Sequence, residues 1–200
     1  MIGLLLKDLC VIRKQIAWYV GMVAVFFALS LASRDATFSA SVGLLATVFV
    51  PLTALAYEER ENWQRFAAAS GLDAKIMVAE KYLLGVAFAL FSSLAYLVVF
   101  LFCFEKGTTW AEFAVPVCLQ FVILSLILPL VFKYGTERGR TMSVVIVAIV
   151  VVVFVAVMGF WGKDFRLAPL VLCLLSAAAA LVLFCGSFFL SVRIYEKKEF

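Results

Sequence analysis

The chain alternates between long apolar stretches and short charged connections. Six apolar stretches lie at residues 16–32, 38–57, 83–104, 113–132, 142–161 and 167–190. Each is near the ~20 residues that an α-helix needs to cross a ~30 Å hydrocarbon core. None shows the strict apolar–polar alternation that is typical of a membrane β-barrel strand. The pattern therefore predicts a single all-α integral membrane domain over residues 1–200, with six transmembrane helices.

The composition supports lipid as the main solvent of this chain. Hydrophobic residues make up 66% of it and charged residues 15%, and the mean hydropathy is +1.13. Soluble domains carry about 25% charged residues, so the charge here is too scarce to cover a water-facing surface. The net charge of +4 does not indicate nucleic acid, because the basic residues flank the apolar stretches instead of forming one patch.

The basic residues are divided unequally between the two sides of the predicted membrane. If the N-terminus is cytoplasmic, all lie inside except four, namely Arg34, Lys106, Lys163 and Arg166. An excess of lysine and arginine in cytoplasmic loops sets the orientation of membrane proteins. We therefore expect a multi-pass protein of the bacterial cytoplasmic (inner or plasma) membrane with both termini in the cytoplasm.

The N-terminal residues 1–15 are amphipathic. Leu5, Leu9 and Ile12 recur at helical spacing, opposite charged positions. This pattern is typical of a short helix that lies in the membrane interface before the chain enters the bilayer.

Several kinds of chemistry lack their motifs in this sequence. There is no GxxxxGK[ST] phosphate loop and no HExxH motif, so we expect neither ATP binding in that mode nor zinc-dependent proteolysis. The chain has no histidine, the commonest proton shuttle and metal ligand. Its five cysteines stand singly, without a CxxC pair that would indicate a metal site. We expect a chain that is not an enzyme and holds no metal or cofactor.

Charged residues are confined to the predicted loops and tails, because no apolar stretch contains Asp, Glu, Lys or Arg. We therefore expect no buried ionisable group. Without one, ion-coupled transport lacks its usual relay residues. An enzyme working inside the membrane is disfavoured for the same reason.

The cytoplasmic loop 58–82 is the only connection long enough for structure of its own. Glu58, Glu59 and Glu61 suit the N-terminus of a short helix, which Ser70-Gly71 would end, and Asp73 suits the N-cap of the next helix.

Trp63 and Phe66 are three residues apart in this loop and are expected to share one face. Two interpretations remain open for these aromatic rings. They rest in the lipid headgroups, or they form a knob that docks on a soluble partner.

Two prolines and one predicted span give weaker indications of where the helices could bend and what a transport route could carry. Pro51 and Pro129 lie about one turn inside the cytoplasmic ends of their predicted spans, where a proline removes a helix hydrogen bond. Either is a possible hinge or an ordinary proline of a membrane helix. The stretch 142–161 is almost entirely Val, Ile, Ala and Phe, so a route along it would suit apolar or amphipathic cargo.

The chain resembles the small ABC-2-type export permeases over its full length. The segments that carry the resemblance are the opening MIGLLLKDL, the loop from YEE at 57–59 to KY at 81–82, the loop FKYG with ERGR at 132–140, and the tail SVRIYEKKEF. The chain is similar in particular to permeases of bacterial exporters for amphipathic peptide toxins of the phenol-soluble modulin type. It departs from that pattern at SGLDAK, 70–75, where the family often has a Pro-hydrophobic-Ser-Arg turn.

The resemblance implies a function. The amphipathic N-terminus would be an elbow helix, and the loop 58–82 would hold the coupling helix that docks on a separate P-loop ATPase. ATP and Mg would bind that partner, and two permease chains, identical or homologous, would pair around a route for an amphipathic peptide or hydrophobic cargo. The residues implied at the ATPase-coupling interface are Glu58, Glu59, Glu61, Trp63, Arg65, Phe66 and Leu72.

A second function from another class stays open. The same loop could anchor a cytoplasmic partner to a membrane subunit that transports nothing, acting as a scaffold or regulator. A neighbouring gene for a P-loop ATPase without membrane spans would favour the permease.

Overall fold

The computed structural model of the chain describes residues 2–34, 37–61, 63–69, 71, 73–102, 110–161 and 169–197. Every regular element in this part is an α-helix, as predicted. The helices are α1 (Ile2–Val11), α2 (Arg13–Ser33), α3 (Thr37–Arg60), α4 (Trp63–Ala69), α5 (Ala74–Phe102), α6 (Trp110–Tyr134), α7 (Thr136–Trp161) and α8 (Pro169–Glu196).

Five of the described helices are long and apolar enough to cross a membrane, namely α2, α3, α5, α6 and α8. The sixth predicted span, 142–161, lies in α7. Most side chains of α7 beyond Val150 lie outside the described residues, so the sixth span stays a prediction.

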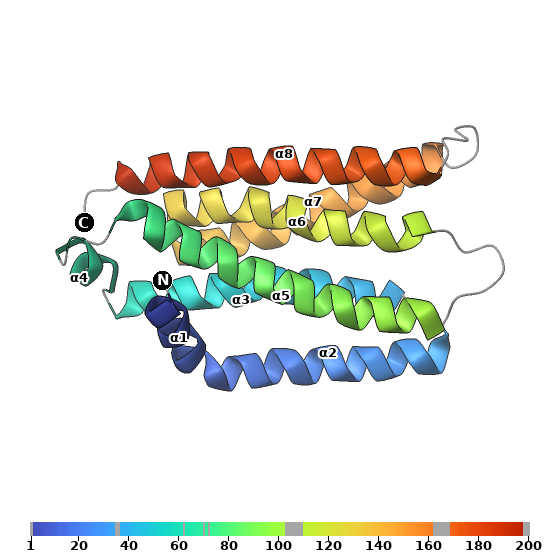
Figure 1. Cartoon of the computed structure of the whole chain (residues 1–200), viewed down its shortest axis with the longest axis horizontal. Coiled ribbons are helices and arrows are strands. Elements are labelled where there is room, and N and C mark those ends of the chain that lie inside the picture. The colour runs from blue at the N-terminus through green and yellow to red at the C-terminus, as the bar shows by residue number, and fades with distance from the viewer. Residues whose placement is uncertain are drawn as a thin grey trace.

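The six long helices run along the length of the molecule, side by side (Figure 1). The short helices α1 and α4 lie together at one end, and α1 is inclined to α2. This end, called the α4 end below, is also where α1 begins and α8 finishes.

The core lies around α6, which packs against α3, α5, α7 and α8. Its buried face follows helical spacing and consists of Ile123, Leu124, Ile127, Leu128 and Val131. Gly85 of α5 faces this surface so closely that an added Cβ would lie 2.8 Å from a Leu124 Cδ atom. Close approach at small residues is the usual way in which membrane helices associate.

Buried hydroxyl groups connect α5, α6 and α8. The Tyr82 hydroxyl shares hydrogen bonds with Ser187 and, at 2.8 Å, with Ser191. Ser187 in turn donates to the backbone carbonyl of Ser125 on α6. Each polar group in this set therefore has a partner within the bundle, as a lipid environment requires.

Several helices extend beyond their predicted spans, and two of these extensions belong to the predicted cytoplasmic loop 58–82. The second predicted span ends at Tyr57, but α3 continues to Arg60, so Glu58 and Glu59 belong to its last turn and do not begin a separate helix. The third predicted span starts at residue 83, but α5 begins at Ala74. It starts directly after Asp73, where the N-cap was predicted. In these extensions Glu58 and Lys81 pair with each other, and Glu59 accepts a hydrogen bond from Thr136.

Pro51 and Pro129 lie inside α3 and α6, and each helix continues for more than a turn beyond its proline. Neither residue ends its helix. Whether either acts as a hinge stays a prediction.

Candidate functional site

The α4 end collects most of the residues predicted for the coupling interface, but these residues do not form one outward surface. Glu58 is buried, Glu59 and Trp63 are half-buried, and Glu61 and Phe66 are exposed. The side chain of Arg65 and the whole of Leu72 lie outside the described residues.

Glu59 holds the start of α7. Its Oε2 atom accepts a hydrogen bond from the backbone N–H of Thr136 at 2.9 Å and another from the Thr136 hydroxyl. A carboxylate at a helix N-terminus satisfies free N–H groups and complements the positive end of the helix dipole. The turn before it is made by Gly135, whose φ of 82° favours glycine. Glu59 therefore caps a helix of its own chain.

Five charged side chains from three helices meet beneath α4, contrary to the prediction that no ionisable group is buried. We call them the charge cluster: Lys7 and Asp8 from α1, Glu58 from α3, and Glu80 and Lys81 from α5. Asp8, Glu58, Glu80 and Lys81 have exposed side-chain fractions of 5% or less. The prediction was wrong because these charges lie just outside the apolar stretches in sequence, while the helices that carry them converge.

Lys81 lies at the centre of the cluster. Its ammonium nitrogen contacts a carboxylate oxygen of Asp8, lies 2.9 Å from Glu58 Oε1, and lies 3.8 Å from Glu80 Oε1. One carboxylate oxygen from each of these three acids lies within 4.8 Å of the other two, a spacing that could hold a metal ion. In this structure the cation among them is Lys81 itself, so the arrangement is that of an internal ion-pair network.

Lys7 closes the cluster on its outer side. Its ammonium nitrogen contacts Glu58 and lies 3.2 Å from Asp8 Oδ1. Its side chain is 24% exposed. Burial acts to lower the pKa of Lys7, but the hydrogen bond to Glu58 and the neighbouring carboxylates outweigh it and raise that pKa above its ordinary value. Lys7 therefore remains a cation.

Glu80 is the one acid of the cluster without a hydrogen-bond partner in the described part of the chain. Both of its carboxylate oxygens are buried and accept no hydrogen bond among the described residues, although Lys81 lies 3.8 Å from one of them. The cluster counts three carboxylates against two ammonium groups, and Lys81 is the nearest cation to Glu80. A buried charge is costly unless it is paired and hydrogen-bonded.

The short helix α4 rests on this cluster through Trp63. The Lys7 nitrogen lies 4.3 Å from the centre of the Trp63 ring, a cation–π contact. Trp63 also packs against the main apolar core, and Ala67, one turn later, is 1% exposed. Trp63 and Ala67 therefore form the inner face of α4.

Phe66 lies on the outer side of α4. Its side chain is 62% exposed, while its ring centre is 5.2 Å from that of Trp63. The two aromatics touch, as their spacing predicts, but they do not project together. Of these two aromatic residues, Phe66 is the one that presents a large apolar surface outward.

The charge cluster could have been found from helical spacing. Lys81 follows Met77 by four residues and Asp8 precedes Ile12 by four, so each occupies a position on a buried apolar face. Acidic and basic residues at such positions on different helices are a signal of pairing. Counting charges only within the apolar stretches missed it.

Comparison with protein families places this geometry in context. A family model described as ABC-2 family transporter protein matches residues 3–196, a range that includes the charge cluster and α4. No curated protein matches the chain, and no solved structure matches it.

Proposed function

The chain belongs to the ABC-2 family of transporter proteins, and we propose that it is the permease subunit of an exporter driven by a separate ATPase subunit. The observation that carries the proposal is the family match, which extends from α1 to the end of α8. Five described helices suited to crossing a membrane agree with a multi-pass transport component.

We place the ATPase contact on α4, with the α4 end facing the cytoplasm. Phe66 supplies an exposed aromatic ring, and Glu61, five residues earlier in the sequence, is exposed as well. Large aromatics that become buried within a polar rim dominate the energetics of protein–protein interfaces. Arg65 and Leu72, from the same segment, complete the proposed contact. ATP and Mg bind the partner, because this chain has no phosphate loop.

The charge cluster supports a role for α4 in transmitting movement. Trp63 joins α4 to Lys7, and Lys7 and Lys81 join α1 and α5 to Glu58 at the end of α3. Ion pairs that are also hydrogen-bonded fix the register of the groups that they join. A displacement of α4 by the ATPase would then move three helices together.

We further propose that two permease chains, identical or homologous, pair and export an amphipathic peptide or a hydrophobic compound. The support is the apolar character of the helices, including the Val- and Ile-rich sequence of α7. Export as the direction rests on the resemblance to small export permeases.

The test compares two exposed phenylalanines, one on α4 and one at the opposite end of the bundle. Phe66→Ala removes the proposed anchor, and its matched control is Phe102→Ala, at an exposed phenylalanine at the last residue of α5, at the opposite end of the bundle. Tagged variants are expressed in the native cell, and the P-loop ATPase that co-purifies with each is quantified. Loss of an aromatic anchor costs about 2–4 kcal/mol, or about 30- to 900-fold in affinity.

We expect Phe66→Ala to lose the ATPase while its expression and membrane insertion match those of Phe102→Ala. Equal recovery of the ATPase with both variants would remove α4 as the contact. Export of an amphipathic peptide by reconstituted vesicles then distinguishes a permease from a membrane anchor. ATPase binding without any ATP-dependent export would favour the anchor.

A further inference from the structure

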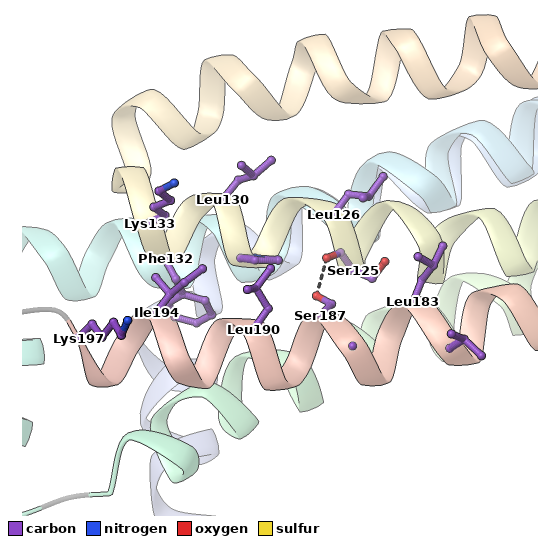
Figure 2. Close-up of a pocket in the computed structure, with 13 residues that line it drawn as sticks. Ser125, Leu126, Leu130, Phe132, Lys133, Leu183, Ser187, Leu190, Ile194 and Lys197 are labelled. Atoms are coloured by element: carbon purple, nitrogen blue, oxygen red, sulfur yellow. Dashed lines mark hydrogen bonds between the residues drawn. The ribbon is translucent and has the colours of Figure 1, made fainter.

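A groove with a volume of about 1030 Å³ lies along α6 and α8. Its apolar walls include Leu126 and Leu130 from α6 and Leu183 and Leu190 from α8, and Figure 2 shows these side chains along the two facing helices. Small-molecule sites have volumes of about 300–1,000 Å³, so the groove is large enough for one long apolar chain. We call it the α6–α8 groove.

The groove is open because its neighbours leave this side of α6 uncovered. Both α7 and α8 pack against α6, but they do not contact each other in the described part of the chain. Gly186, on the groove wall, leaves further room, since no atom outside its own helix backbone lies within 4 Å of the position that a Cβ would take.

One end of the groove is positively charged. Lys133 near the end of α6 and Lys197 just beyond α8 both line it at the α4 end, and Figure 2 shows them at the same end of the apolar lining. No salt bridge is formed by either lysine within the described residues. The described lining contains no acidic residue.

We propose that the α6–α8 groove binds one anionic membrane phospholipid. An acyl chain would lie along the leucines, and the phosphate would contact the ammonium groups of Lys133 and Lys197. The pattern of an apolar channel with cations at only one end, on a helix bundle that crosses the membrane, matches the chemistry of such a lipid. This site is independent of the ATPase contact on α4.

Charge complementarity favours this occupant over the others. A zwitterionic lipid gains less from two cations, and free phosphate would leave the long apolar wall unused. A second copy of the chain would have to bring an acidic group to Lys133 and Lys197 while filling the groove with apolar side chains.

The test uses two variants of the full-length chain that act on opposite ends of the lipid. Lys133→Gln with Lys197→Gln removes the charge, and its matched control is Lys75→Gln, at an exposed lysine in the first turn of α5. Gly186→Leu fills the apolar part, and its control is Gly21→Leu on α2, where a Cβ also meets no atom within 4 Å. Leucine favours helix more than glycine does, so neither leucine variant should disturb its helix.

Each purified protein is mixed with phosphatidylglycerol or phosphatidylcholine in detergent, and bound lipid is counted by native mass spectrometry. We expect one phosphatidylglycerol per wild-type chain. Each lysine near a membrane surface contributes about 5-fold in affinity for an anionic lipid, so the double lysine variant should lose about 25-fold. Gly186→Leu should lose the bound lipid, and both controls should bind as the wild type does.

Three results would overturn the proposal. The double lysine variant could bind phosphatidylglycerol as tightly as Lys75→Gln does. Inorganic phosphate could displace the lipid as well as phosphatidylglycerol does, which would indicate a site for free phosphate. Gly186→Leu could dissociate a dimer while leaving bound lipid unchanged, which would identify the groove as a contact between two copies.

Discussion

Replacing Lys81 with methionine tests whether one ammonium group balances the charge cluster. Lys81 is 1% exposed and lies among the carboxylates of Asp8, Glu58 and Glu80. Methionine has a similar unbranched shape and adapts to irregular packing. The substitution therefore removes the charge and leaves most of the volume.

The contacts of Lys81 set the expected loss of unfolding free energy. After the substitution, three carboxylates would share Lys7 alone, and Glu80 would lose its nearest cation. Removing one partner of a buried ion pair costs about 3–5 kcal/mol, because the other charge stays buried without compensation. Folded domains are stable by only about 5–15 kcal/mol. We therefore expect Lys81→Met to lose a large part of the unfolding free energy.

The assay measures the unfolding of the detergent-solubilised chain by denaturant or by heat. Lys75→Met, at an exposed lysine six residues earlier on α5, is the matched control and should change stability little. Adding Asp8→Asn to Lys81→Met removes one stranded carboxylate and should restore part of the loss. A coupling energy of about 1 kcal/mol or more between the two sites would show direct interaction.

The reasoning would be refuted by a Lys81→Met protein as stable as Lys75→Met. It would also be refuted if the effects of Asp8→Asn and Lys81→Met on the unfolding free energy were additive. In either case the contacts of Lys81 would not hold α1 and α5 together.

Three further substitutions have separate expected outcomes in the same unfolding assay. Glu80→Gln should keep or raise stability, since neither oxygen of this carboxylate has a hydrogen-bond partner among the described residues; a loss as large as that of Lys81→Met would contradict this. Tyr82→Phe should cost about 0.5–1.5 kcal/mol for each of the hydrogen bonds lost, to Ser187 and Ser191, and unchanged stability would count against these contacts. Gly85→Val should cost about 1–3 kcal/mol by overpacking against Leu124; a tolerated valine would show that the two helices can separate there.

The helices themselves could be predicted because lipid imposes a simple rule. A stretch of about 20 apolar residues without charge has to be helical in a bilayer, where backbone groups need partners within the same segment. Each predicted stretch accordingly overlaps one long helix, α2, α3, α5, α6, α7 or α8. The family could also be predicted, because the resemblance extended over the whole chain and the family match confirms it.

The buried charges could not be predicted from the apolar stretches alone. The third predicted span begins at Leu83, yet α5 begins nine residues earlier, and Lys81 lies deep in the bundle. A lysine can occupy such a position only when acids on other helices reach it. That condition depends on tertiary packing, which places Asp8 and Glu58 around it.

The positions of the two aromatic residues of α4 could likewise be predicted only in part from the sequence. Helical spacing brings Trp63 and Phe66 into contact, and their rings do touch. Spacing does not say which part of that face turns toward the bundle, because α4 is short and its position depends on what lies beneath it. Lys7 and the apolar core hold Trp63, and Phe66 is left outside.

The charge cluster also explains how α1 is held at the α4 end. This helix packs through few residues, and Leu6 is 56% exposed. In its described part, Asp8 is buried against Lys81, and Ile12, just after the helix, is buried against α3 and α5. Apolar contacts alone would let such a short helix slide, because they are not directional. The ion pairs of Lys7 and Asp8 have fixed partners on α3 and α5, so under the proposed coupling a movement of these helices would carry α1 with it. An apolar α1 of the same size would not be coupled in this way.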